Sequence, residues 1–371
     1  MRIGIDGHAI GAHKTGNETY TFELVKGLTQ LAPNGYRYFI YLTNSDVVAN
    51  PPFQATNFSF RCIRPSFPAL RIPLGFPVES RLRHLDLFHA QYFLPPNLGC
   101  RTVLTVHDIG FETYPELYDK KYLFWFRSLI PRSCERADHI IAVSEFTRRD
   151  LIRKYHLPPG KIAVTYCGIG GQYRPMDEGE ARRRVLQRYG IADPFILYVG
   201  NLQPRKNLRN LIRAFSRLRR RHSVYKLVLA GQKAFEYAEI FRSVRDTGLE
   251  DSVFFPGYVS STDLPLLYAA AAVFVYPSIF EGFGLPVIEA MACGAPTITS
   301  HGSSLEEVAG DGAELVDPLD VDQIHHAMER VLLDSNFRAD LRERGLRRAA
   351  AFTSRNLGAE TLRIYELVIG R

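Results

Sequence analysis

Two carboxylates bracket a glycine-proline turn in the stretch EGFGLPVIEAMACGAP, which begins at Glu281. Glu289 follows the turn, and Pro286 suits the first turn of a helix because its missing N–H is not needed there. Gly282 and Gly284 leave the backbone before that helix uncovered. The N–H groups at the helix N-terminus would then favour an anion such as a phosphate.

The separation of the two glutamates limits what they can do together. On one continuous helix, eight positions leave two side chains about 80° out of alignment, so we expect Glu281 in the loop and Glu289 in the first helical turn. A carboxylate is repelled by a phosphate but accepts hydrogen bonds from paired neutral hydroxyls, which sugars supply. One glutamate for a transferred sugar, one for a ribose and N–H groups for a diphosphate would explain the spacing. The alternative is a helix that begins with favourable acidic residues.

The elements that must position these residues follow an α/β pattern. The chain has 371 residues, of which 46% are hydrophobic, so it can form two domains with separate cores. Short apolar runs alternate with amphipathic helical stretches, which is typical of parallel α/β units. The strands expected from these runs are residues 2–6, 36–42, 58–63, 85–90, 101–106 and 139–143, then 195–200, 225–231, 252–259, 271–278 and 295–300.

Two similar sets of strands predict two doubly wound domains. The composition changes near residues 166–180, where glycine, proline and polar residues replace periodic apolar ones. We therefore expect an N-terminal domain over 1–172 and a C-terminal domain over 173–350, with a helix over 351–371 that packs back on the first domain. Ligands of such sheets bind beyond the carboxyl ends of the strands.

The positive charge lies in the first half. Residues 1–175 hold 21 Lys and Arg against 14 Asp and Glu, whereas the remaining residues hold 25 of each. This predicts an anionic partner for that half: nucleic acid, a lipid surface or a phosphorylated acceptor. Residues 118–139 mix cations with aromatic side chains, and they could lie in an anionic membrane interface or pack in the core.

Other classes of protein fit less well. The chain has no apolar run of about 20 residues and no signal-peptide pattern, which predicts a cytoplasmic protein, peripheral at most at the inner face of the membrane. Its five cysteines are scattered and do not form a C-x-x-C pair, so neither a disulfide framework nor a zinc site is expected. The first glycines have the wrong intervals for a Rossmann dehydrogenase, and no nucleic-acid-binding motif accompanies the basic half.

The stretch around Glu281 and Glu289 resembles the signature of retaining glycosyltransferases of family 4. That resemblance implies a GT-B fold, with two Rossmann-like domains facing a central cleft. VGNLQPRKNL resembles the family's diphosphate clamp and implies Arg205 and Lys206 as its charges. TVHDIGF matches the segment whose histidine, here His107, lies at the donor sugar.

The resemblance extends over the whole chain. HKTGNETY resembles the N-terminal glycine loop, with Gly16 over the phosphates, although many members have two adjacent glycines where this chain has Thr15 and Gly16. EEVAGDGAELVDP resembles the closing segment of the family, and the backbone near Tyr258 and Val259 would receive the base. The other substrate-binding residues that the resemblance implies are Asp108, Gly200, Phe283, Gly284 and Leu285.

A mechanism follows from this assignment. Cleavage of the bond between the anomeric carbon and the diphosphate leaves growing negative charge, which Arg205, Lys206 and the turn N–H groups would stabilise without a metal or other cofactor. The resemblance implies retention, with His107 positioning the sugar, Glu281 holding its hydroxyls and Glu289 anchoring the ribose.

The sequence favours GDP-mannose as donor because TVHDIGFETYPELY looks more like mannosyl-transferring members. The expected acceptor is a glycan or a lipid-linked saccharide. A UDP-sugar-dependent glucosyltransferase and a nucleotide-sugar epimerase of the same fold remain alternatives.

Overall fold

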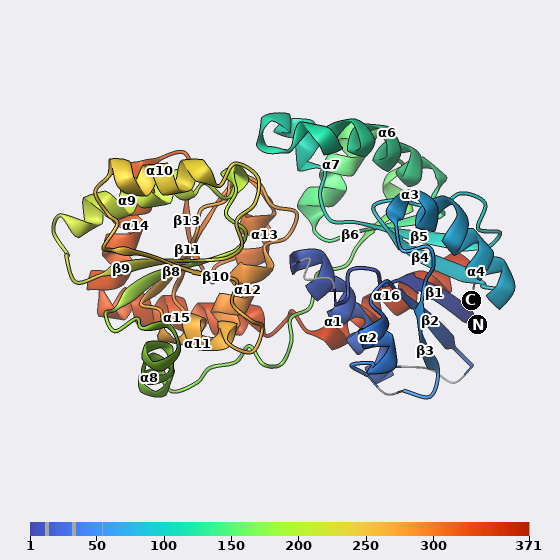
Figure 1. The fold of residues 1–371 in the computed structure, drawn as a ribbon, viewed down its shortest axis with the longest axis horizontal. Helices are drawn as coiled ribbons and strands as arrows, with labels where there is room; N and C mark the ends of the chain where they lie inside the picture. Colours follow the sequence, from blue (N-terminus) through green and yellow to red (C-terminus); the bar gives the residue numbers. More distant parts are fainter. Residues whose placement is uncertain (12–14, 32–34, 54, 371) are drawn as a thin grey trace. The chain divides into compact units, whose positions relative to one another are not determined.

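The computed structural model describes residues 1–11, 15–31, 35–53 and 55–370, which form two compact units (Figure 1). Unit 1 comprises Met1–Pro115, Lys120–Gly170 and Phe352–Arg371. Unit 2 comprises Glu116–Asp119 and Gly171–Ala351. The long crossing from one unit to the other therefore falls between Gly170 and Gly171, and the chain returns to unit 1 at Phe352.

Unit 1 is built on a seven-stranded parallel sheet in the order β3-β2-β1-β4-β5-β6-β7. Most of its central strand residues are buried, as expected for strands covered on both faces. The strands are β1 (Arg2–Asp6), β2 (Arg37–Leu42), β3 (Phe58–Cys62), β4 (Leu87–Gln91), β5 (Arg101–Val106), β6 (His139–Ala142) and β7 (Ile162–Val164).

The helices of this half of the chain cover and border that sheet (Figure 1). They are α1 (Thr15–Leu31), α2 (Ser45–Ala49), α3 (Pro68–Leu70), the π-helix η1 (Arg71–Gly75), α4 (Phe76–Arg83), α5 (Gly110–Thr113), α6 (Lys120–Arg136) and α7 (Glu145–Tyr155), with the 3-10 helices η2 (Pro115–Leu117) and η3 (Pro159–Lys161).

The C-terminal helix α16 (Ser354–Ile369) packs on α1 at very short range. A Cβ atom on Gly27 would lie 1.9 Å from the Ser354 carbonyl oxygen, and one on Gly358 would lie 2.5 Å from the carbonyl carbon of Gly27. Only glycine on both helices permits this approach. The hydroxyl of Ser354 also bonds the buried Glu23 carboxylate.

Unit 2 has a six-stranded parallel sheet in the order β10-β9-β8-β11-β12-β13. The strands are β8 (Phe195–Val199), β9 (Lys226–Ala230), β10 (Val253–Gly257), β11 (Val273–Tyr276), β12 (Thr297–Ser300) and β13 (Glu314–Val316). The helices are α8 (Glu178–Tyr189), α9 (Leu208–Arg219), α10 (Ala238–Asp246), α11 (Leu264–Ala270), α12 (Leu285–Ala292), α13 (Ser304–Ala309), α14 (Val321–Leu333) and α15 (Ser335–Ala349), with the 3-10 helix η4 (Pro204–Lys206).

The predicted α/β class with two parallel sheets is confirmed. Each expected strand corresponds to an observed one, and the two strands that were not predicted, β7 and β13, have three residues each. Strands this short carry too few residues for a periodic pattern. Across the part of the chain that the structure describes, no helix combines the length and apolar character needed to cross a bilayer.

Candidate active site

In unit 2, two neighbouring parallel strands bring three charged side chains together. β8 leads into η4, which carries Arg205 and Lys206, and β11 leads into the loop that carries Glu281. β8 and β11 pair in parallel, so their C-terminal ends meet at one edge of the sheet. Residues some 75 positions apart in sequence therefore become neighbours through the sheet order.

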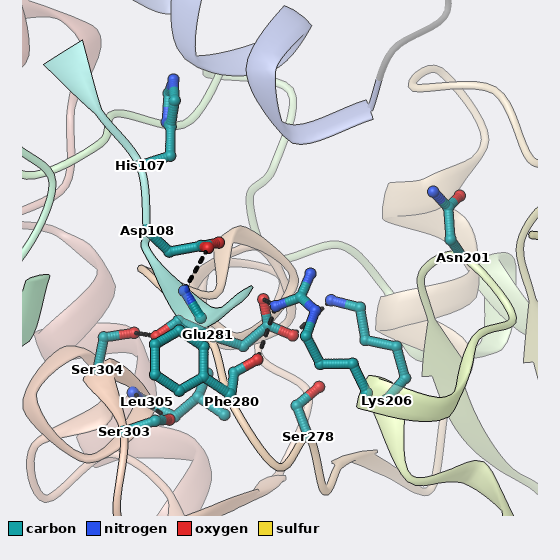
Figure 2. A network of polar contacts seen from close by, with 12 residues as sticks. His107, Asp108, Asn201, Lys206, Ser278, Phe280, Glu281, Ser303, Ser304 and Leu305 are labelled. Atoms are coloured by element: carbon teal, nitrogen blue, oxygen red, sulfur yellow. Dashed lines mark hydrogen bonds and ion pairs between the residues drawn. The ribbon is translucent and has the colours of Figure 1, made fainter. Parts of the chain in front are cut away.

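The Glu281 carboxylate pairs with both cations. Its Oε2 lies 2.9 Å from Arg205 Nη1. Its Oε1 pairs with Lys206 Nζ, and Figure 2 shows these two side chains close together. Arg205 Nη1 also donates to the carbonyl of Phe280 at 2.6 Å. We call Arg205, Lys206 and Glu281 the charged cluster, and its formal net charge is +1.

Glu281 is ionised in this setting. Burial by itself would raise its pKa, but the charges of Arg205 and Lys206 outweigh burial and lower the pKa to about 2. The carboxylate thus remains ionised throughout the neutral pH range, and its lone pairs could accept hydrogen bonds from hydroxyl groups. The cluster combines sites for an anion and for hydroxyl groups within one hydrogen-bonded set.

Two polar residues that the sequence did not single out hold this cluster. The buried hydroxyl of Tyr276, at the end of β11, donates to Glu281 Oε1 at 3.1 Å and accepts from Lys206 Nζ at 2.5 Å. Ser304, at the start of α13, donates from Oγ to the Glu281 carbonyl oxygen at 2.8 Å (Figure 2). The position of Tyr276 at a strand end, five residues before Glu281, was the available signal.

The glycine-proline turn leads into α12 as predicted, and its conformation requires glycine. Gly284 has a φ of 98°, and a Cβ there would lie 2.3 Å from Leu305 Cδ2. Phe283 and Leu285 on either side are buried. The turn is therefore fixed by packing against the first turn of α13.

The placement of Glu289 in the first helical turn was wrong. It is the fifth residue of α12, one turn further on, because the helix begins at Leu285. Its buried carboxylate accepts a hydrogen bond from the Tyr268 hydroxyl at 2.9 Å. A tyrosine of α11 thus helps to orient this carboxylate in the structure.

The other predicted residues of unit 2 lie at strand ends. Gly200 follows β8 with a φ of 148° and donates its N–H to the Ala230 carbonyl at 2.9 Å. Tyr258 and Val259 follow β10; the tyrosine is 53% exposed, whereas the valine is buried. These positions agree with the rule that ligands of parallel sheets bind beyond the carboxyl ends of strands.

In unit 1, His107 follows the end of β5 and bonds to Gln91 at the end of the neighbouring β4. The distance from His107 Nε2 to Gln91 Oε1 is 2.9 Å. Gln91 Nε2 donates to the Asp6 carbonyl at 3.3 Å and to Thr21 Oγ1 at 2.5 Å. Because a carbonyl oxygen only accepts, the amide orientation is fixed, and His107 Nε2 must be the donor. The neutral ring then has its unprotonated nitrogen at Nδ1.

A second histidine, His89, belongs to a neighbouring hydrogen-bonded network of neutral groups. His89 bonds through Nδ1 to the Tyr365 hydroxyl and through Nε2 to Thr105 Oγ1, both at 2.7 Å. Thr105 continues to the Tyr20 hydroxyl at 3.0 Å, and the ring of Tyr20 meets that of His107 edge-on at 4.8 Å. Burial lowers the pKa of His107 to about 4 and that of His89 to about 3, so both rings are neutral at pH 7.

Asp108 and Gly16 occupy helix starts. Asp108 Oδ1 accepts from the Gly110 N–H at 3.1 Å, where α5 begins. Gly16 is the second residue of α1, so the predicted glycine loop is helical at this position. A Cβ on Gly16 would meet nothing within 4 Å, so packing does not require glycine here. The residues before Thr15 in that motif, His13 and Lys14, lie outside the described residues.

These features define a class of protein: two parallel-sheet units with charged and hydrogen-bonding residues at their C-terminal strand ends, in the arrangement of GT-B glycosyltransferases. Sucrose-phosphate synthase from Thermosynechococcus elongatus has the same fold, with a TM-score of 0.80 and 22% identity, over 100% of this chain and 99% of that one. A family model described as Glycosyl transferases group 1 matches residues 183–348, and one described as Glycosyltransferase Family 4 matches residues 15–170.

The chain belongs to this glycosyltransferase family. It is 37% identical to O-antigen chain mannosyltransferase B of Escherichia coli over 284 residues, which are 76% of this chain and 74% of the relative. It is also 34% identical to the serotype-specific mannosyltransferase WbdA of Escherichia coli. That match covers 70% of this chain and 32% of the larger protein. The predicted family, fold and enzyme class are confirmed by these matches.

Proposed function

We propose that the protein transfers mannose from GDP-mannose, with retention at the anomeric carbon, to a hydroxyl of a glycan or lipid-linked saccharide. The charged cluster is the observation that carries this proposal. It places two cations and an ionised carboxylate at one strand edge, as the leaving diphosphate and the sugar hydroxyls require. The mannosyl donor is supported by the names of the relatives that match most of the chain.

In this mechanism, the bond between the anomeric carbon and the diphosphate oxygen breaks as the acceptor oxygen bonds to the same face of the carbon. The leaving phosphate takes the proton from the acceptor hydroxyl. Arg205 and Lys206 stabilise the charge that grows on the diphosphate, and Glu281 accepts from sugar hydroxyls. Since these cations supply the positive charge, we expect no metal to be required.

The remaining residues have supporting roles in the proposal. Glu289, oriented by Tyr268, anchors the ribose hydroxyls. The neutral His107 offers Nδ1 as an acceptor to a donor-sugar hydroxyl, because its Nε2 proton is directed to Gln91.

We further propose that α6 binds an anionic membrane surface at which a lipid-linked acceptor would be met. Phe124 and Trp125 of α6 are 68% and 57% exposed, so they are not part of the core. Lys120 and Lys121 precede them on the same helix. Exposed aromatic residues beside cations are what an interfacial helix requires.

A donor screen tests the central proposal. We expect GDP-mannose to be consumed faster than UDP-glucose, GDP-glucose or UDP-galactose, and the product to keep the α configuration of the donor in its NMR coupling pattern. Preference for a UDP-sugar would overturn the donor assignment. Conversion of the nucleotide-sugar to an epimer without any acceptor would support the epimerase alternative instead.

A further inference from the structure

A continuous helical segment of unit 1 carries large apolar side chains on its solvent side. α3, η1 and α4 follow one another without a break from Pro68 to Arg83. The exposed apolar residues, which we call the 67–82 face, are Phe67, Leu70, Leu74, Val78 and Leu82, and each has at least 47% of its surface exposed. Soluble surface helices normally direct such a stripe toward the core.

The spacing shows that these residues share one side of the segment. They recur at intervals of three, four, four and four, or about 3.75 residues per turn, slightly more than an α-helix has. The π-helical turn η1 accounts for the difference, because the Phe76 N–H bonds to the Arg71 carbonyl five residues back. The opposite side is already packed, since Arg71, Gly75, Phe76 and Ser80 are buried.

The loop 92–100, which joins β4 to β5, forms hydrogen bonds with both this segment and α6. Ser80 and Arg81 donate to the carbonyls of Leu98 and Asn97 at 2.8 and 2.9 Å. From the other side, Ser133 Oγ of α6 accepts from the Leu94 N–H at 3.0 Å. The 67–82 face and the exposed aromatic residues of α6 thus belong to two helices that hold the same loop.

The charges around the face indicate what covers it. Arg81 and Arg83 lie on the segment and Arg64 lies just before it, whereas the acidic residue of the segment, Glu79, pairs with Arg83 at 3.5 Å. A second copy would bring the same excess of positive charge to this face, which disfavours its pairing with itself. An anionic bilayer provides acyl chains for the apolar residues and headgroup phosphates for the cations.

We infer that the 67–82 face inserts into the interface of an anionic membrane, in addition to the attraction exerted by α6. Insertion of apolar side chains does not depend on ionic strength, whereas attraction between charges is screened within about 3 Å at 1 M salt. Lipid binding should therefore have a salt-resistant part that comes from this face. This inference deepens the membrane part of the proposed function and does not depend on the donor.

Sedimentation with vesicles of phosphatidylglycerol and phosphatidylcholine tests it. The variant Leu74→Ser/Val78→Ser should bind about tenfold more weakly, and what remains should be released at high salt. The matched control, Leu319→Ser/Leu333→Ser, removes two exposed leucines of unit 2 and should bind like the unmodified protein. A second pair, Leu70→Ser/Leu82→Ser, should repeat the effect, and melting curves confirm folding of each variant.

Three outcomes would overturn the inference. Binding of the unmodified protein could vanish entirely at high salt, which would leave only electrostatic attraction. The Leu74→Ser/Val78→Ser variant could bind as tightly as the control. The protein could form a dimer that this variant dissociates, without vesicle binding, which would assign the face to a second copy. Hydrolysis of GDP-mannose, measured in parallel, tests the proposed donor separately from lipid binding.

Discussion

The two units differ in the electrostatic environment near the C-terminal ends of their parallel strands: it is charged in unit 2 and neutral in unit 1. Unit 2 gathers two cations and a carboxylate whose pKa is lowered to about 2, so the charged cluster stays ionised. Unit 1 gathers His107, His89 and hydroxyl groups, and burial lowers the pKa values of both histidines so that they stay neutral. Partner charges decide the difference, because burial alone disfavours the charged form in both units. We expect unit 2 to stabilise charge that changes in the reaction and unit 1 to orient neutral hydroxyls.

Removal of a cation from the charged cluster should have the largest effect. We expect Arg205→Ala and Lys206→Ala each to slow transfer by about a hundredfold or more, because each loses a preorganised contact to the leaving group. Arg209→Ala, an exposed neighbour on α9, is the control and should remain active. Initial rates at saturating donor, with and without EDTA, provide the measurement. A strict need for magnesium or manganese would contradict the view that protein charges suffice.

Substitution of the two glutamates should change the affinity for a nucleoside diphosphate in different ways. Glu289→Ala should weaken GDP binding by about tenfold, the loss of one or two hydrogen bonds to ribose. Glu281→Ala should leave GDP binding unchanged or tighten it, because it raises the net charge of the cluster from +1 to +2. Titration calorimetry gives both constants. If the Glu281 variant loses more affinity for GDP, the two assigned roles are reversed.

In unit 1, Gln91 should act by fixing the tautomer of His107. Gln91→Met keeps the length of the side chain but removes the amide acceptor, so we expect kcat/KM to fall by about three- to tenfold. Nitrogen NMR of His107 should show an Nε2–H ring in the unmodified protein and a mixture in the variant. Gln91→Glu should raise the pKa of His107, since a carboxylate would then face it. If the ring signals are unchanged in both variants, Gln91 does not determine the tautomer of His107. Gln187→Met, on the exposed side of α8, is the control.

The smallest effect on transfer, and a clear one on stability, should come from the buried His89. Its pKa is about 3 in the folded state and near 6.5 when unfolded, so below pH 6.5 the unfolded chain binds a proton that the folded chain does not. Stability should therefore fall as pH decreases from 6.5 toward 3, by about 2 kcal/mol between pH 6.5 and 5. His107, whose pKa is lowered to about 4, adds a similar dependence, so His89→Gln should make the pH dependence of unfolding between pH 7 and 5 clearly shallower without abolishing it. An equally steep dependence in the variant would assign it to other groups.

The sequence by itself determined the elements and the candidate chemistry. Runs such as RIGID and FILYVG are apolar enough to predict buried parallel strands. Arg205 and Lys206 were identified from the family resemblance of the segment that follows FILYVG, and their position after a strand end supported that assignment. Pro286 and Gly284 similarly mark where α12 begins. These features are local, because backbone preference and periodicity are properties of a few adjacent residues.

Only the tertiary structure decided which of these residues meet. The pairing of Glu281 with Arg205 and Lys206 depends on the order of β8 and β11 in the sheet, and that of His107 with Gln91 depends on β4 and β5. Exposure was equally undetermined: the apolar run of α6 is compatible with a core or a surface, and the structure places Trp125 in solvent. Contacts across strands and the fraction of a side chain that is covered are set by residues far away in sequence, so no local pattern contains them.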